Sequence, residues 1–340
     1  MRYYLEKLAA RENLSLAEMK EAAALLFMEQ VSESEAGAFL GLLAAKGENA
    51  DEMAGLAMAV KEAAPRFPAV SRSLMDNCGT GGDGSCSFNI STASAFVLAG
   101  AGITVAKHGN RSISSRTGSA DVLENLGVPL HLSPEECTEL LEENGIVFLF
   151  APHQHPVLKK VMKIRRDLRI PTIFNMIGPL TNPAELDTQL VGIYRSDKLN
   201  EVARVLRLLG RRRAVVLNGA GEMDEATLAG DTNLVIVEGG SISHMTLSQE
   251  ETGLPYYPNE AIRGGDAGRN ADILLGVLRG DHGAYRDTVL LNAGLGIFAN
   301  GTASTIQEGI HIASESIDSG AALSKLQCLI QYSRPGKQVM

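Results

Sequence analysis

The sequence predicts an α/β protein in which a small N-terminal helical domain precedes a larger domain with a mixed, mainly parallel sheet flanked by helices. Two observations support this prediction. The first seventy residues contain helical patterns, little glycine and no convincing strand. From about Leu74 onward, short apolar segments alternate with helical segments, and glycine occupies the joints. Such alternation is typical of parallel strands connected by helices that cover the sheet.

Three helical patterns fill the N-terminal region. Ser15 and Ser32 each stand three residues before a glutamate, the spacing of a capping box that opens a helix. In the third pattern, residues 53–60 place four apolar side chains on one helical face. Pro65 and Pro68 then end the region. We therefore expect helices alone before the α/β pattern begins.

The larger domain is predicted element by element from its apolar runs and glycine joints. Strands are expected at residues 103–106, 147–150, 214–217 and 234–237. Helices are expected at residues 91–99, 119–126, 134–143 and 197–209, and again throughout residues 271–331.

The predicted division places a helical domain at residues 1–72 and an α/β domain at residues 73–340. The N-terminal helices are too few to bury a large core alone. We therefore expect helices from about residues 155–188 to join them. A cleft between the two domains is the natural place for a ligand.

Composition narrows the function classes. The 340 residues include 31 Lys and Arg against 40 Asp and Glu, a formal charge of -9, which argues against a nucleic-acid surface. The four cysteines show no zinc-ligand spacing. No signal peptide and no membrane-spanning apolar run is visible. We expect a cytoplasmic protein without membrane or nucleic-acid partners.

The glycine-rich segment at residues 79–94, GTGGDGSCSFNISTAS, is the densest chemical signal. Its glycines permit positive φ, so that several backbone N–H groups can converge on one anion. Ser91 and Thr92 then begin an apolar helix, whose N-terminus extends an anion site. The segment is neither a Walker loop nor a GxGxxG fingerprint. Taken alone, a flexible glycine loop with an ordinary helix cap explains it equally well.

The segment KHGNRSISS at residues 107–115 favours the anion site. It follows the predicted strand at 103–106, and open α/β sheets bind ligands at the carboxyl ends of their strands. It contains two cations, an imidazole, an amide and several hydroxyls but no acid, as a phosphate site requires. A polar surface loop, the alternative, does not explain the missing acids. Ser119 begins the next helix and offers a second N-terminus.

Asp224 and Glu225 follow the predicted strand at 214–217, at another carboxyl edge. Magnesium prefers one or two carboxylates together with phosphate oxygens and water. Alone, the pair would be interpreted as a solvated acidic turn. Beside a polyphosphate site, a magnesium site becomes the better hypothesis.

Other polar groups are less informative. Arg165 and Arg166 lie on a predicted helix, where one can bind a carboxylate bidentately or both can form a solvated face. His153 and His155 are interpreted as part of a loop at a helix start rather than as metal ligands. Residues 211–213, three arginines, are expected to form a surface run before a strand.

The segments GTGGD, FNIST, KHGNRSISS, MDE and IGPLTNP together resemble the anthranilate phosphoribosyltransferases over nearly the whole chain. The resemblance implies a fold like that of the nucleoside phosphorylases, a homodimer joined through the helical domain, and Mg²⁺. It also implies transfer of the phosphoribosyl group of 5-phosphoribosyl 1-diphosphate to the amine of anthranilate. The products would be N-(5-phosphoribosyl)anthranilate and pyrophosphate, in tryptophan biosynthesis.

The resemblance further implies residue roles. The diphosphate substrate would be bound by Gly79, Gly82, Asp83, Ser87, Asn89, Ile90, Ser91, Thr92, Lys107, His108, Gly109, Asn110, Arg111, Ser112, Ile113, Ser114, Ser115 and Ser119. Anthranilate would be bound by Gly79, Asn110 and Arg165, and Mg²⁺ by Ser91, Asp224 and Glu225. No general base is assigned: His108 is a candidate proton acceptor, with an orienting role at least as well supported.

Two alternative functions remain at this point. A pyrimidine nucleoside phosphorylase shares the fold, but a single phosphate needs fewer cations and no Mg²⁺. A non-catalytic relative that binds nucleic acid would need a basic surface, which the acidic composition disfavours.

Overall fold

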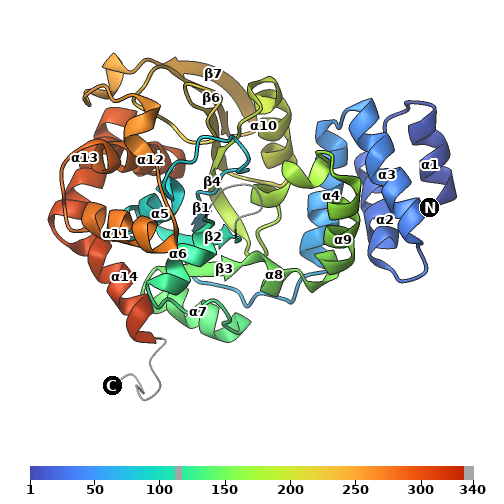
Figure 1. Ribbon diagram of the computed structural model, residues 1–340, viewed down its shortest axis with the longest axis horizontal. Helices are drawn as coiled ribbons and strands as arrows, with labels where there is room; N and C mark the ends of the chain where they lie inside the picture. The colour runs from blue at the N-terminus through green and yellow to red at the C-terminus, as the bar shows by residue number, and fades with distance from the viewer. Residues whose placement is uncertain (112–116, 333–340) are drawn as a thin grey trace.

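A seven-stranded sheet in the order β3-β2-β1-β4-β5-β6-β7 forms the centre of the larger part of the molecule (Figure 1). The structure is a computed structural model that describes residues 1–111 and 117–332. The strands are β1 (Leu74–Asp76), β2 (Thr104–Gly109), β3 (Ile146–Phe150), β4 (Leu186–Gly192), β5 (Arg213–Asn218), β6 (Thr232–Glu238) and β7 (Ser241–Leu247). Strands β1 to β5 pair in parallel, whereas β6 and β7 join antiparallel at one edge. The predicted mixed, mainly parallel sheet is confirmed.

The four predicted strands correspond to β2, β3, β5 and β6, whereas β1, β4 and β7 were missed. Strand β4 was missed because its centre is polar: Thr188 and Gln189 are fully buried. The Gln189 Nε2 group donates to the Pro179 carbonyl at 2.6 Å, which compensates the burial of the amide. Strand β1 has only three residues, and most of the edge strand β7 is exposed. Neither carries a strong apolar pattern.

The two faces of the sheet bury different helices. On β5, Val215 and Leu217 belong to the core that contains most of helix α5 (Ile90–Gly100). The alternate residues Ala214 and Val216 belong to a second core, on the side of α10 (Leu199–Leu208). This alternation follows from the two-residue period of a strand.

The remaining helices of the larger part surround α5 or the far edge of the sheet. The C-terminal helices α11 (Ala267–Leu278), α12 (Ala284–Asn300), α13 (Ile306–Asp318) and α14 (Ala321–Tyr332) all contact α5. Helix α7 (Pro134–Glu143) packs on β2 and β3, and α6 (Ser119–Asn125) packs on α11. The prediction that residues 271–331 are mainly helical is confirmed.

The N-terminal region consists of four helices (Figure 1). They are α1 (Arg2–Ala9), α2 (Leu16–Phe27), α3 (Glu33–Lys46) and α4 (Ala50–Glu62). The capping boxes of Ser15 and Ser32 are present in the structure. Helix α9 (Lys159–Leu168) packs on α2 and α3. Because α4 also contacts α10, the second core continues from these helices to the sheet.

Arg211 corrects the prediction that residues 211–213 form a surface run. Its side chain is buried, with Nε donating to Gln189 Oε1 at 3.0 Å and Nη1 to the Leu186 carbonyl at 3.2 Å. The guanidinium thus satisfies the polar atoms inside β4. Arg212 does lie at the surface, where it pairs with Asp187.

Within the described part of the chain, no helix is long and apolar enough to cross a membrane.

Glu52 joins three segments of the helical region through its carboxylate. The side chain is fully buried, accepts hydrogen bonds from the Leu14 and Asn49 amides, and pairs with Lys46 Nζ at 2.9 Å. The Lys46 side chain is only 5% exposed. Removing one partner of a buried pair leaves the other charge uncompensated.

We expect Glu52→Ala to lower the free energy of unfolding by about 3 kcal/mol or more, because Lys46 and two backbone amides lose their acceptor. Urea unfolding measures the change. Glu29→Ala, at an exposed position on the same region, is the control and should change stability by less than about 0.5 kcal/mol. Equal effects of the two substitutions would contradict the role given to Glu52.

Candidate functional site

A cavity of about 390 Å³ opens at the carboxyl ends of β1 and β2. One wall is formed by the loops that follow these strands and by Asp224 and Glu225 after β5. The opposite wall comes from residues 151–181, which include α9. Every predicted site residue that the structure describes lines this one cavity. The remaining predicted residues, Ser112, Ile113, Ser114 and Ser115, lie outside the described residues.

The acidic turn, Asp224 and Glu225, lies against three glycines that end or follow the strands β1, β4 and β5. A Cβ on Gly79 would meet the Asp224 carboxylate, and one on Gly192 would meet the Asp224 carbonyl. A Cβ on Gly219 would meet the Glu225 carbonyl. Only glycine therefore permits the approach of the turn to β1, β4 and β5. The Gly81 amide then donates to Asp224 Oδ2 at 2.6 Å.

The environment of the acidic turn disfavours ionisation of both carboxyl groups. Burial raises the pKa of Asp224, and the neighbouring Asp83 raises it further. Burial also raises the pKa of Glu225, with Asp224 as the second cause and Lys107 opposing it. The Ser91 amide donates to Glu225 Oε1 at 3.2 Å. A bound cation would relieve this repulsion, so the residues fit a metal ion.

The donor set fits magnesium shared with a ligand better than a complete protein cage. No group of three or more His, Cys, Asp or Glu side chains in residues 1–111 and 117–332 is arranged to hold a metal. Magnesium is commonly held by one or two carboxylates, with phosphate oxygens and water as its other ligands. The predicted ligands Ser91, Asp224 and Glu225 all reach the cavity.

The glycine loop turns sharply over the cavity. Gly81, Gly82 and Gly84 have φ between +67° and +85°, and Cys86 also has a positive φ of 55°. Helix α5 follows, and its N-cap residue Asn89 makes no capping bond with its own side chain. The N-terminus of α5 therefore lies beside the loop without the side-chain cap that opens α2 and α3. A helix N-terminus in this state favours an anion.

Lys107 and His108 at the end of β2 are both buried. The Lys107 ammonium donates to the Asn77 carbonyl at 3.2 Å, and the His108 amide donates to Asp76 Oδ1 at 3.2 Å. Burial, and secondarily His155, lowers the pKa of His108 to about 3. The imidazole is thus neutral near pH 7, with Nδ1 lying 3.3 Å from the Gly178 carbonyl. Because a carbonyl only accepts, Nδ1 carries the proton.

Arg111 lines the cavity but is already paired with acids. Its Nη1 lies 2.8 Å from both Asp121 Oδ1 and Glu124 Oε2. The segment 107–115 contains no acidic residue, but two acidic residues of α6, Asp121 and Glu124, pair with its arginine. Contact of Arg111 with a diphosphate stays a prediction, and it would require exchange of these partners.

Arg165 presents a guanidinium at the opposite wall. Its Nη2 donates to Asn175 Oδ1 at 3.2 Å, and the group lies 5.6 Å from the centre of the Phe174 ring. Burial lowers the pKa of Arg165. Within the described residues no acid lies in ion-pair distance of it, so its charge remains available for a carboxylate. The neighbouring Arg166 is exposed, so only Arg165 fits the site hypothesis.

Residues that the sequence patterns did not assign to a site also line the cavity. His155 lies between α8 (Ala151–Gln154) and α9, in the loop expected for it, but its ring is buried. It packs edge-on against His108 with 5.4 Å between ring centres. No local pattern distinguishes His155 from the exposed His153. Other such lining residues are Thr80, Phe88, Thr117, Leu158, Met162, Phe174, Asn175 and Thr181.

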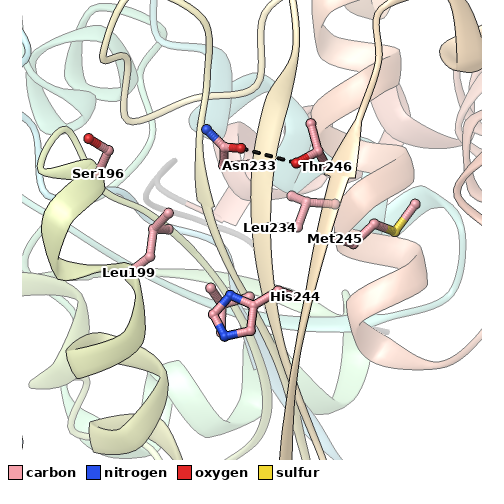
Figure 2. A pocket seen from close by; sticks show the side chains of 8 residues that line it. Ser196, Leu199, Asn233, Leu234, His244, Met245 and Thr246 are labelled. Atoms are coloured by element: carbon pink, nitrogen blue, oxygen red, sulfur yellow. Dashed lines mark hydrogen bonds between the residues drawn. The ribbon is translucent and has the colours of Figure 1, made fainter.

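Figure 2 shows a second hollow, lined by Ser196 and Leu199 on one side and by residues of the β6–β7 hairpin on the other. Asn233 and Thr246 there are joined by a hydrogen bond of 3.2 Å. His244 is the one ionisable side chain among its lining residues. The hollow lacks the charge and the converging amides of the first cavity.

Comparisons with known proteins show the family to which the chain is similar. The glycosyl transferase family helical bundle domain matches residues 2–64, and the glycosyl transferase family a/b domain matches residues 71–323. The anthranilate phosphoribosyltransferase of Exiguobacterium sibiricum is 61% identical, over 97% of both chains. That of Listeria innocua is 57% identical over 98% of both.

Solved structures show the same similarity in three dimensions. The crystal structure of anthranilate phosphoribosyltransferase from Thermus thermophilus superposes with a TM-score of 0.92 at 39% identity, covering 97% of this chain and 99% of the other. The enzyme from Saccharomyces cerevisiae in complex with PRPP and Mg superposes with a TM-score of 0.89 at 27% identity, covering 97% of each.

We expect Gly192→Ala to lower the free energy of unfolding by about 1–3 kcal/mol, because its methyl group would overlap the Asp224 carbonyl. Urea unfolding measures the change. Gly41→Ala is the matched control: a Cβ there meets nothing within 4 Å, and the helical position should gain up to about 1 kcal/mol. An unchanged stability of Gly192→Ala would show that the acidic turn does not need the glycine.

We expect acidification to destabilise the chain through His155. Burial lowers its pKa to about 4, against about 6.5 when unfolded. Between these values the unfolded chain binds the extra proton, so stability is lost as pH falls. The His155→Gln variant lacks this titrating group and does not lose stability in this way. When the pH falls from about 7 to about 5, its free energy of unfolding should therefore rise by about 2 kcal/mol relative to that of the parent, as measured by urea unfolding. The exposed His311→Gln is the control, and a pH-independent difference for His155→Gln would contradict the burial of a neutral ring.

Proposed function

The chain belongs to the glycosyl transferase family and within it to the anthranilate phosphoribosyltransferases, and we propose on that premise how its residues divide the reaction. The enzyme transfers the phosphoribosyl group of 5-phosphoribosyl 1-diphosphate to the amine of anthranilate, in tryptophan biosynthesis. The products are N-(5-phosphoribosyl)anthranilate and pyrophosphate. The phosphorylase and nucleic-acid-binding alternatives are set aside, because relatives 54–61% identical over nearly the full length are named as this transferase.

The observation that carries the division of roles is the opposite chemistry of the two cavity walls. The sheet-side wall offers glycine-loop amides, the N-terminus of α5, the buried ammonium of Lys107 and the acidic turn. The helical-side wall offers the guanidinium of Arg165 beside an aromatic ring. We assign the diphosphate substrate to the first wall and the aromatic acid to the second.

On the sheet side, the predicted residues from Gly79 to Thr92 and from Lys107 to Arg111 surround the phosphates, with Ser119 beside them. Ser91, Asp224 and Glu225 would hold Mg²⁺, which neutralises charge that develops on the leaving pyrophosphate. A solved homologue in complex with PRPP and Mg supports this proposal. The fixed amides of the loop stabilise the same developing charge without reorganising during the reaction.

On the helical side, Arg165 binds the carboxylate of anthranilate, and Asn110 and Gly79 contact the acceptor from the sheet-side wall. An aromatic amine is a weak nucleophile, so its alignment with the anomeric carbon matters more than a strong base. His108 supports this view, because an imidazole with a pKa of about 3 is a poor proton acceptor near pH 7. We therefore assign His108 an orienting role.

We further propose a cytoplasmic homodimer joined through the helical domain, with that domain at residues 1–72 and the α/β domain at residues 73–340. The family resemblance supports the dimer, and the composition supports the compartment. A Mg²⁺-dependent mechanism follows from the acidic turn described above.

We expect Arg165→Ala to raise the KM for anthranilate by about 30-fold, since a hydrogen-bonded charge contributes about 2 kcal/mol. The KM for the diphosphate substrate should stay unchanged, because Arg165 lies on the other wall. The loss of anthranilate fluorescence on mixing the enzyme with both substrates and Mg²⁺ measures turnover. Arg166→Ala, the exposed neighbour, is the control. Equal increases in both KM values would show that the acceptor has been assigned to the wrong wall.

A further inference from the structure

The segment 262–270 packs against the glycine loop through backbone hydrogen bonds, although no sequence pattern linked the two segments. The Phe88 amide donates to the Ile262 carbonyl at 3.1 Å, and the Gly264 amide donates to the Cys86 carbonyl at 2.9 Å. Residues 262–264 therefore run antiparallel to the loop just before α5. The position of the loop depends on this distant part of the chain.

Asn270, in the first turns of α11, closes a ring of four hydrogen bonds around this contact. Its Oδ1 accepts from the Gly265 amide at 2.7 Å, and its Nδ2 donates to Asn89 Oδ1 at 2.9 Å. Asn89 Nδ2 in turn lies 3.5 Å from the Thr117 carbonyl, and Thr117 Oγ1 donates to the Gly265 carbonyl at 2.9 Å. Asn270 is only 2% exposed, so water does not replace these bonds.

The ring determines which way the Asn89 amide faces. The Gly265 amide can only donate, so the oxygen of Asn270 must face it and the Asn270 NH₂ must face Asn89. The Asn89 oxygen is thereby occupied. At the other end of the ring, the Thr117 carbonyl can only accept, so the NH₂ group of Asn89 must face it. Both fixed groups belong to the backbone, and Asn89 therefore turns its oxygen toward Asn270 and its NH₂ group toward the Thr117 carbonyl, on the side where both Asn89 and Thr117 line the cavity.

The surroundings leave Asn270 little freedom to move. A Cβ on Gly264 would lie 2.6 Å from Asn270 Oδ1 and 2.9 Å from the Phe88 Cα, so the glycine is needed for this packing. Asp266 caps α11, with Oδ1 accepting from the Arg269 amide at 2.8 Å. The Asp266 cap and the hydrogen bonds of Asn270 thus both fix the first turn of α11.

We propose that Asn270 is a positioning residue for the diphosphate substrate: it holds the Asn89 amide with its NH₂ group toward the bound phosphates. The inference rests on the proposed function, in which Asn89 contacts that substrate. Asn270 itself does not line the cavity, so it acts only through its neighbour. A hydrogen-bond donor aimed at an anion stabilises it, whereas a carbonyl oxygen in the same place repels it.

Asn270→Asp tests the proposal, because it keeps an acceptor for the Gly265 amide but replaces the donor that faces Asn89. The Asn89 amide must then turn and present its oxygen to the phosphates. We expect the KM for the diphosphate substrate to rise about tenfold, with the KM for anthranilate unchanged. Asn270→Ala, which adds no charge, should give a smaller rise in the same KM and keeps the test valid should the first variant fail to fold.

Asn144→Asp is the matched control for a buried asparagine. Asn144 is 5% exposed and donates to the Lys325 carbonyl at 3.1 Å, remote from the cavity-lining residues. It should lose thermal stability without changing either KM. A rise in the KM for the diphosphate substrate as large as that of Asn270→Asp would overturn the proposal, because general destabilisation would then explain both.

The double-mutant cycle with Asn89→Ala separates this inference from the proposed function. With Asn89 removed, Asn270→Asp should have little further effect on the KM for the diphosphate substrate. If Asn89→Ala raises that KM and Asn270→Asp does not, or if their effects add fully, the inference about Asn270 is overturned alone. An unchanged KM in Asn89→Ala would instead overturn the assignment of Asn89 in the proposed site.

Discussion

The close approach of the acidic turn to three strand ends is the constraint on which the rest of the site depends. Asp224 and Glu225 reach the cavity only because β1, β4 and β5 are followed or ended by Gly79, Gly192 and Gly219, where a Cβ would overlap the turn. The approach brings buried carboxylates together and raises the pKa of both. Carboxylates placed in this way fit the proposed Mg²⁺, which prefers to share its ligands between one or two carboxylates and phosphate oxygens.

The second wall depends on a different part of the fold. Arg165 lies on α9, which packs on α2 and α3, and the core of these helices continues through α10 to the sheet. The two substrates are thus assigned to elements of two different cores: α5, after the glycine loop, belongs to the core on one face of the sheet, and α9 belongs to the core on the other. Because different elements build them, the anion-binding loops and the acceptor site can differ in chemistry. In the proposed arrangement both substrates are held so that the amine of anthranilate meets the anomeric carbon of the diphosphate substrate. The alignment of reactants, rather than a strong base, then carries most of the chemistry.

Sequence patterns predicted the parts of the site whose chemistry is local. The consecutive glycines, the acid-free basic segment and the adjacent carboxylates indicate a ligand only when they are taken together, and their described residues that were predicted for the site line one cavity. Features that depend on tertiary contacts were missed. Strand β4 was not recognised because Gln189 and Arg211 satisfy each other inside the protein. The sequence around His155 and Asn270 indicates no role for either residue. The residues that they contact, His108 and Asn89, are far away in the chain.

In the proposed site, the buried acidic turn makes binding of the diphosphate substrate depend on a cation. Isothermal titration of the unmodified enzyme with 5-phosphoribosyl 1-diphosphate, once with Mg²⁺ and once with a chelator, tests it most directly. We predict at least about tenfold tighter binding with Mg²⁺, since the carboxylates otherwise repel the phosphates. Equal affinity in both titrations would contradict the account, because the acidic turn would then have no role in holding the substrate.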